Sequence, residues 1–188
     1  MRWFSSQQPV HVVVHVGKPP KKRTRATEKE NPDRLIIPTD LLLSGWRQLF
    51  PAERMVVFGG QSTRKGVRLT SMTDVTEAHP SVVHVNACPA RFGQAVIDFE
   101  RTGAHLALWM HSHPGEGARA TNPSSIDIDQ ERSLRQHYSD RLVSLITVKD
   151  GYLRMWGEPI TQGLVHVHWL GQGIEATKEP NVYRLRLS

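Results

Sequence analysis

Histidine spacing gives the clearest chemical signal in this sequence. Ten histidines occur among 188 residues, and two pairs have the spacing His-x-His: His111 with His113, and His166 with His168. Residues i and i+2 of a strand lie on the same face, so either pair could direct two imidazoles at one metal ion. The spacing alone does not choose between them.

The residues around each pair distinguish the two. His166 and His168 continue a regular alternation with valine, which is typical of a half-exposed strand with the histidines on its solvent side. His111 and His113 instead follow the apolar run 104–110 and precede a Pro-Gly pair, which predicts a site at the edge of a sheet. We therefore expect the chemistry at the first pair.

Ser124 and Asp127 lie beyond the following loop, and two interpretations of them stay open. The pattern Ser-x-x-Asp before a helix predicts a helix cap, with Ser124 at the N-cap and Asp127 in the third helical position. Asp127 could also supply an oxygen ligand from the start of that helix. Two imidazoles, one carboxylate and an open fourth position describe a catalytic zinc site rather than a structural one.

Together these residues resemble the JAMM signature of the JAB/MPN metallopeptidase family. The resemblance rests on His111-Ser112-His113, the following Pro-Gly, Ser124-x-x-Asp127, and an upstream Glu53 whose apolar stretch ends in Gly59-Gly60. It covers about residues 35–157. It implies a JAB/MPN-like mixed β-sheet flanked by helices, and a zinc-dependent peptidase or isopeptidase that often acts at the C-terminal glycine of a ubiquitin-like protein. Some members of the family lack the ligands and serve as scaffolds, whereas this sequence keeps all of them.

The resemblance also implies a role for each residue. His111, His113 and Asp127 bind zinc with water as the fourth ligand, and zinc lowers the pKa of that water toward about 7. Glu53 accepts the proton of the water and later passes it to the leaving amine. Ser124 donates a hydrogen bond to the oxyanion of the tetrahedral intermediate.

One spacing departs from the family pattern. The family usually has seven residues between the second histidine and the serine, whereas residues 114–123 make ten here. Ser124 and Asp127 keep their mutual spacing, so we expect the additional residues to enlarge the loop beside the site. The departure bears on the shape of the substrate groove more than on the presence of zinc.

Three functional hypotheses follow. The leading one is a bacterial-type isopeptidase that removes or matures a ubiquitin-like modifier. Its expected partners are that modifier and its conjugates. The activating and conjugating enzymes of the same pathway are further candidate partners. A second is processing of a small sulfur-carrier protein, whose C-terminal Gly-Gly would fit the same groove. A third is a RadC-like, DNA-associated or scaffolding domain with residues 17–34 as a basic arm. The nearly neutral charge of the rest of the chain disfavours nucleic acid as a partner.

Length and composition indicate a single folded domain. With 38% hydrophobic residues, the chain can bury a core without a disulfide or a structural metal. The single cysteine, Cys88, excludes an internal disulfide and favours a reducing cytoplasm. No stretch approaches 18 apolar residues, so we expect a cytoplasmic protein without a membrane span or a secretory signal.

Charge divides the chain into segments. The formal net charge is +6, and residues 17–34 hold seven basic residues against three acidic ones. Their composition predicts a solvated linker, with a docking surface for an acidic partner as the alternative. We accordingly expect an N-terminal strand extension (1–16), a basic linker (17–34), the metallopeptidase domain (35–157), and a C-terminal strand and tail (158–188).

Hydrophobic periodicity and turn residues predict the elements that must position the site. We expect helices at 41–50, 89–101 and 127–138, and strands at 10–16, 53–58, 67–71, 82–85, 104–110, 142–148, 152–156 and 164–170. Gly59-Gly60 and Lys65-Gly66 are expected in turns, and 164–170 as the last strand. Strands interleaved with helices predict an α/β or α+β sandwich around one mixed sheet.

Overall fold

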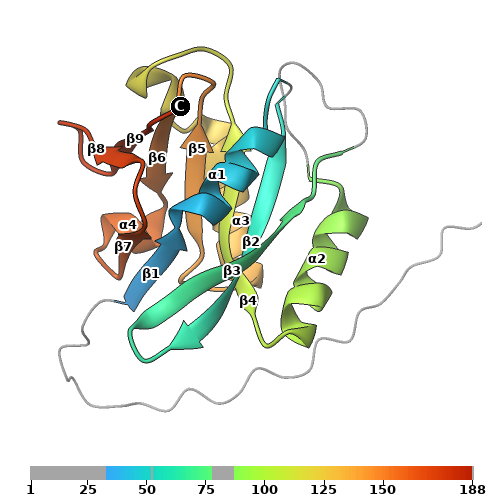
Figure 1. Ribbon diagram of the computed structural model, residues 1–188. Coiled ribbons are helices and arrows are strands. Elements are labelled where there is room, and N and C mark those ends of the chain that lie inside the picture. Colours follow the sequence, from blue (N-terminus) through green and yellow to red (C-terminus); the bar gives the residue numbers. More distant parts are fainter. Residues whose placement is uncertain (1–32, 52, 78–86, 188) are drawn as a thin grey trace, which may run out of the picture. The chain divides into compact units, whose positions relative to one another are not determined.

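Nine strands form one mixed sheet in the computed structural model, which describes residues 33–51, 53–77 and 87–187 (Figure 1). The elements follow one another as β1 (Asp33–Pro38), α1 (Thr39–Gln48), β2 (Met55–Thr63), β3 (Gly66–Asp74), α2 (Pro89–Arg101), β4 (His105–Ser112), the 3-10 turn η1 (Ala118–Thr121), α3 (Ser125–His137), β5 (Val143–Thr147), β6 (Tyr152–Trp156), α4 (Glu158–Thr161), β7 (Val165–Leu170), β8 (Ile174–Ala176) and β9 (Val182–Leu185). Residues 31–188 cluster into one compact unit. The expected mixed α/β class is therefore confirmed.

The strand order across the sheet is β7-β1-β3-β2-β4-β5-β6-β9-β8. β4 lies at its centre, antiparallel to β2 and parallel to β5. Seven of its eight residues are buried, as expected of a strand covered on both faces. The central position of β4 gives its C-terminal end, where His111 lies, a rigid support.

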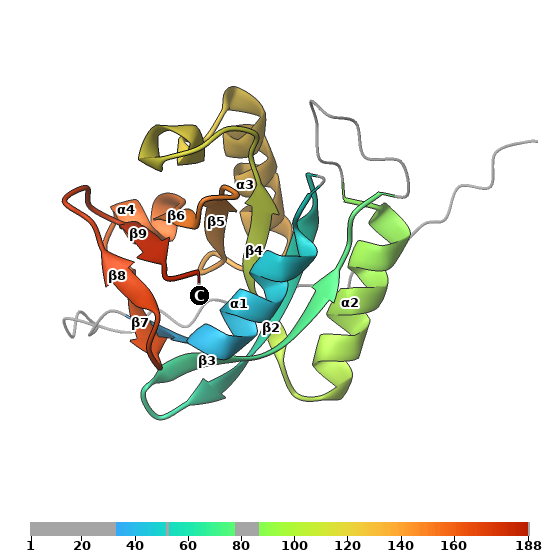
Figure 2. The same cartoon turned by 45° about the horizontal axis from the view of Figure 1, so that its top comes forward.

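Helices cover both faces of the central strands (Figures 1 and 2). Leu42 of α1 and Leu49, which follows this helix, belong to one core cluster, which includes residues of β1 to β7 and β9. Phe92 and Phe99 of α2 belong to a second cluster on the opposite face, against which Leu134 of α3 also packs. Alternate residues of each strand therefore serve two different cores.

The sheet curves around α1 so that strands far apart in the order approach each other. Trp169 of β7 contacts Tyr183 of β9, with ring centroids 4.9 Å apart. Trp46 of α1 donates an indole hydrogen bond to the carbonyl of Val148, just beyond β5, at 3.3 Å. The C-terminal strands thus belong to the same packed unit as the site.

The expected elements agree with the structure at most positions. α2 and β6 have the predicted bounds, and α1, α3, β5 and β7 begin and end within two residues of them. The strands expected at 10–16 and 82–85 lie outside the described residues, as does nearly all of the linker expected at 17–34, although β1 begins at Asp33.

Two expectations are wrong. Gly59-Gly60 lies inside β2 rather than in a turn. Glycine is needed there because a Cβ at Gly59 would come within 2.7 Å of the Phe99 ring, and its absence lets α2 approach the sheet. Residues 164–170 are not the last strand, because β8 and β9 follow, and β9 pairs with β6. The segment expected as a C-terminal tail is therefore part of the sheet.

Within the described residues, no helix is both long and apolar enough to cross a membrane.

Candidate metal centre

The two histidines of the first pair lie where β4 ends. His111 is the penultimate residue of the strand and only 3% exposed, and its ring stacks on that of Trp109 with centroids 4.8 Å apart and planes 9° apart. Trp109 and His111 share a face because strand side chains alternate. His113 follows the strand, and its backbone N–H donates to the carbonyl of Thr147, the last residue of β5, at 2.9 Å. Both imidazoles are therefore held by the central strands.

Asp127 enters the site from the first turn of α3, and its exposed fraction is 6%. Its carboxylate Oδ2 accepts a 2.6 Å hydrogen bond from the backbone N–H of Ser124. The Ser124 hydroxyl oxygen in turn accepts a 3.3 Å hydrogen bond from the backbone N–H of Asp127. This reciprocal capping box confirms one of the two open interpretations, and the same carboxylate also faces the histidines, as the other required.

Three ligand atoms converge at this point. His111 Nε2 lies 3.0 Å from His113 Nε2 and 3.0 Å from Asp127 Oδ1. His113 Nε2 lies 3.2 Å from Asp127 Oδ2. Among the described residues these three side chains form the group of histidine, cysteine and acidic residues whose geometry could hold a metal ion.

The charges of the three groups are strongly coupled. Burial lowers the pKa of His111, although Asp127 favours its charged form. Burial also opposes the charged form of His113, but the hydrogen bond and negative charge of Asp127, with a contribution from Glu53, raise its pKa overall. For Asp127, burial is outweighed by hydrogen bonds from both histidines and from Ser124, which hold its pKa well below the ordinary value. A deprotonated carboxylate and a neutral His111 are the forms that bind metal.

This donor set fits a transition-metal ion. Tetrahedral ligands at 2.0–2.1 Å from zinc are about 3.3–3.4 Å from one another, close to the spacing of these three side chains. The two imidazole nitrogens face each other and also face the carboxylate. Because the lone pairs of these atoms point at one another, a proton or a cation must lie between them. A buried group of two histidines and one aspartate is therefore able to bind a metal ion.

The outer nitrogens of the two imidazoles differ in their surroundings. His113 Nδ1 lies 3.1 Å from the backbone carbonyl of Ala120 in η1, so this nitrogen carries the proton and Nε2 keeps the lone pair that a metal requires. Nδ1 of His111 is buried, and the described residues offer it no hydrogen-bond partner. His111 is instead oriented by its stacking on Trp109, whose indole N–H donates to the hydroxyl of Ser144.

Glu53 lies beside the same site. β2 and β4 pair with Met55 opposite His111, and this pairing continues past the strand end, where Arg54 N–H donates to the Ser112 hydroxyl at 3.1 Å. Glu53 comes one residue before Arg54, at the end of the chain segment that runs beside Ser112 and His113. Its charge contributes to the raised pKa of His113, as expected of a nearby carboxylate.

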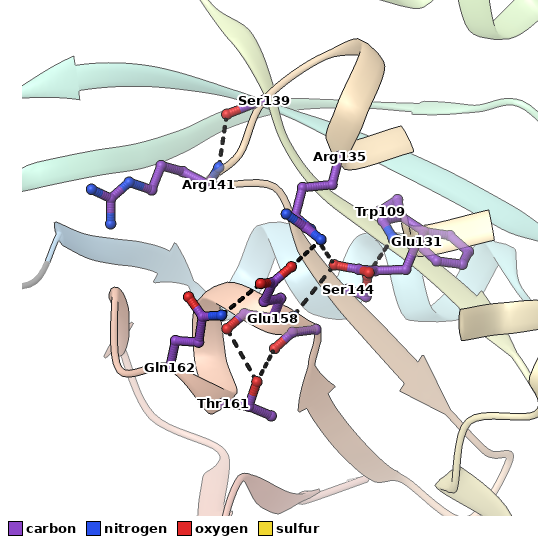
Figure 3. Close-up of polar contacts among 10 residues, drawn as sticks. Trp109, Glu131, Arg135, Ser139, Arg141, Ser144, Glu158, Thr161 and Gln162 are labelled. Carbon is purple, nitrogen blue, oxygen red and sulfur yellow. Dashed lines mark hydrogen bonds and ion pairs between the residues drawn. The ribbon is translucent and has the colours of Figure 1, made fainter. Parts of the chain in front are cut away.

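The helix that carries Asp127 is anchored one turn further on (Figure 3). Glu131, 5% exposed, accepts a hydrogen bond from Arg135 Nε at 3.2 Å and a long one of 3.4 Å from the backbone N–H of Glu158. Arg135 also forms an ion pair with Glu158 at the start of α4. These contacts fix α3 against the start of α4, and thereby the position of Asp127.

The structure brings the sequence-predicted residues into one region. His111, His113 and Asp127 are in direct contact, Ser124 bonds Asp127, and Glu53 acts electrostatically on His113. The second histidine pair is exposed on β7, as its alternation with valine predicted.

Sequence reasoning missed two contributors to the site. Trp109 could have been found, because it lies two residues before His111 on a predicted strand and must share its face. The Ala120 carbonyl gives no sequence signal, since any residue supplies one.

Comparison with known proteins adds little. The chain matches no protein-family profile and no curated protein. Among solved structures, the solution structure of protein DSY2949 from Desulfitobacterium hafniense is similar, with 18% identity, a TM-score of 0.46, and coverage of 72% of this chain and 94% of that one. This likeness is too weak to support an argument about fold family or function.

Proposed function

We propose that this protein is a zinc-dependent peptidase of the JAB/MPN type that cleaves after the C-terminal glycine of a ubiquitin-like protein, either in conjugates or in a precursor. The observation that carries the proposal is the convergence of His111, His113 and Asp127 within hydrogen-bonding distance at the end of a central strand. The order and spacing of these residues with Ser124 and Glu53 resemble the JAMM signature, which selects peptidase chemistry from the many uses of such a donor set.

Zinc in this group would polarise the scissile carbonyl and lower the pKa of the attacking water. Glu53 takes the proton of that water on its carboxylate and delivers it to the leaving amine. Its electrostatic effect on His113, one of the proposed ligands, supports this role, because a base must lie next to the water that it deprotonates.

Ser124 can combine capping with catalysis. Its hydroxyl oxygen accepts the cap bond from Asp127 N–H, which uses a lone pair, while its O–H donor helps to lower the pKa of the Asp127 carboxylate. In the proposal that donor stabilises the oxyanion, a contribution typically worth about 2.7–4 kcal/mol.

The preferred substrate follows from the reaction geometry. An extended chain passing the metal has least steric conflict when the residue before the scissile bond is glycine, which has no side chain. Contacts with a folded modifier would supply the orientation that a short peptide lacks. We place this reaction in the cytoplasm, together with the enzymes that activate and conjugate the modifier.

A cleavage assay tests the proposal. The substrate is a candidate ubiquitin-like protein whose C-terminal glycine is joined to the ε-amine of a lysine in a reporter peptide, with a second substrate that carries valine in place of that glycine. We expect zinc-loaded protein to cleave the glycine substrate at least about 100-fold faster. Glu53→Gln should abolish cleavage, whereas Glu100→Gln, which changes an exposed carboxylate on α2, should not.

Two results would redirect the proposal. Equal cleavage of generic peptides with bulky residues before the scissile bond would indicate a broad metallopeptidase. Cleavage restricted to a small sulfur-carrier protein that ends in Gly-Gly would indicate precursor processing in sulfur transfer. Full activity of Glu53→Gln would contradict the assigned base.

A further inference from the structure

The ten-residue connection between His113 and Ser124 is tied to the β5–β6 hairpin. The backbone N–H of Gly117 donates to Asp150 Oδ2 at 2.9 Å, and Glu116 forms an ion pair with Lys149 at 3.0 Å. Gly117 has a φ of 77°, which suits glycine and lets the chain enter η1. The loop beside the metal centre is therefore held in place by residues of the β5–β6 hairpin, which are not part of the signature.

Arg154 of β6 makes the largest share of these contacts. Its Nε donates to the Thr121 hydroxyl at 3.3 Å, and its Nη2 donates to the Ala118 carbonyl at 3.4 Å. The same Nη2 forms an ion pair with Glu179 at 2.6 Å. The side chain of Arg154 is only 14% exposed, so these bonds form with little competition from water.

The turn that Arg154 holds also orients a metal ligand. Ala118 and Thr121 are the first and last residues of η1, and Ala120 between them presents its carbonyl to His113 Nδ1 at 3.1 Å. Thr121 is fully buried, and its hydroxyl donates to the Ala118 carbonyl at 2.6 Å, which closes the turn. A shift of η1 would move the acceptor that fixes the tautomer and ring plane of His113.

We propose that Arg154 is a positioning residue for the metal centre, acting on His113 through η1, and that Glu179 in the C-terminal segment supports Arg154. The inference rests on the proposed metal-binding function of the triad. It gives the β6 strand and the C-terminal segment a role in positioning His113, although neither belongs to the signature. The contacts of Arg154 in η1 are Thr121 and Ala118 rather than the metal-ligating side chains.

The test compares Arg154→Met with wild type in metal binding. We expect a zinc dissociation constant about 10-fold larger, by competition with a chromophoric chelator, because outer partners of ligating histidines typically contribute 10–100-fold. At saturating Co2+, the visible absorption spectrum should also change, since the orientation of His113 alters the ligand field. Loss of global stability alone would leave the spectrum of the saturated site unchanged. Arg154→Lys should restore part of the affinity.

Matched variants make the result decisive. Arg132→Met removes an arginine of α3 whose side chain is 57% exposed and paired with Asp129, and it should leave metal binding unchanged. Glu179→Ala removes the ion pair of Arg154, and Thr121→Val removes the hydroxyl that accepts from Arg154 together with its bond to Ala118; these two variants carry the test if Arg154→Met does not fold. Each should weaken zinc binding less than Arg154→Met.

The outcomes separate two failures. The positioning role is wrong if Arg154→Met binds zinc within about twofold of wild type and has an unaltered Co2+ spectrum. If Arg154→Met does not fold, the same result for both milder variants shows that the role is wrong. If wild type itself binds no zinc, or binds it equally well after His113→Ala, the proposed metal centre fails instead.

Discussion

Replacing Glu131 by methionine should destabilise the protein through the anchor of α3. Methionine has a similar length and favours helices, so the change removes the carboxylate with little effect on shape or helix propensity. Two hydrogen bonds disappear: one from the Arg135 guanidinium at 3.2 Å and a weaker one of 3.4 Å from the backbone N–H of Glu158.

The magnitude follows from these contacts. A hydrogen bond to a charged group contributes about 1.5–3 kcal/mol, and the longer bond adds less. Arg135 keeps its ion pair with Glu158, so no arginine charge is left without a partner and the larger penalty of breaking a buried pair does not apply. Burial of a methionine stem recovers part of the loss. We expect a net decrease of about 2 kcal/mol in the free energy of unfolding, which corresponds to about 4–8 °C in the melting temperature.

Urea denaturation of the metal-free protein is the assay. Asp129→Asn is the matched control on the same helix, because Asp129 forms an exposed pair with Arg132 and its loss should cost under about 0.5 kcal/mol. If the free energy of unfolding of Glu131→Met lies within about 0.5 kcal/mol of wild type, the assignment of Glu131 as the anchor is refuted.

Three further predictions concern other parts of the fold. Burial opposes the charged form of Asp74, but hydrogen bonds lower its pKa overall. The ionised carboxylate should therefore contribute about 1 kcal/mol to the free energy of unfolding above about pH 5, and this contribution should disappear as the pH falls below about 4. The difference in unfolding free energy between wild type and Asp74→Asn, measured over this pH range, tests the prediction. Gly59→Ala should cost about 1–3 kcal/mol by overpacking against Phe99, measured by thermal unfolding; an unchanged melting temperature would contradict the close approach. Ser124→Ala should lose about 1 kcal/mol of stability through the cap and roughly 100-fold in turnover through the oxyanion, and unchanged turnover would reduce its role to capping.

Local patterns predicted the parts of the site that are local in sequence. The apolar run before His111 predicted a buried strand, and Ser124-x-x-Asp127 predicted the capping box, because each signal needs only neighbouring residues. The meeting of Asp127 with the histidines was one of two open interpretations until the resemblance favoured it, since no spacing rule states how a helix start docks beside a strand end.

Other features depend on contacts between distant segments. Gly59-Gly60 has the local signature of a turn, but the approach of Phe99 from α2 places it in a strand. β8 and β9 are three and four residues long, too short for a recognisable period, and their pairing with β6 stabilises them. Arg154 gave no signal because its partners in η1 are 33 and 36 residues away in the sequence.

Metal analysis of purified protein tests the central claim most directly. Protein expressed without added metal is analysed for transition metals by mass spectrometry, together with a His111→Ala/His113→Ala variant and a matched His166→Ala/His168→Ala variant from the exposed strand β7. We predict close to one zinc per chain in wild type and in the β7 variant, and almost none in the first variant. Full zinc occupancy after loss of His111 and His113 would contradict the proposed metal centre, and loss of zinc only in the β7 variant would assign the metal to His166 and His168.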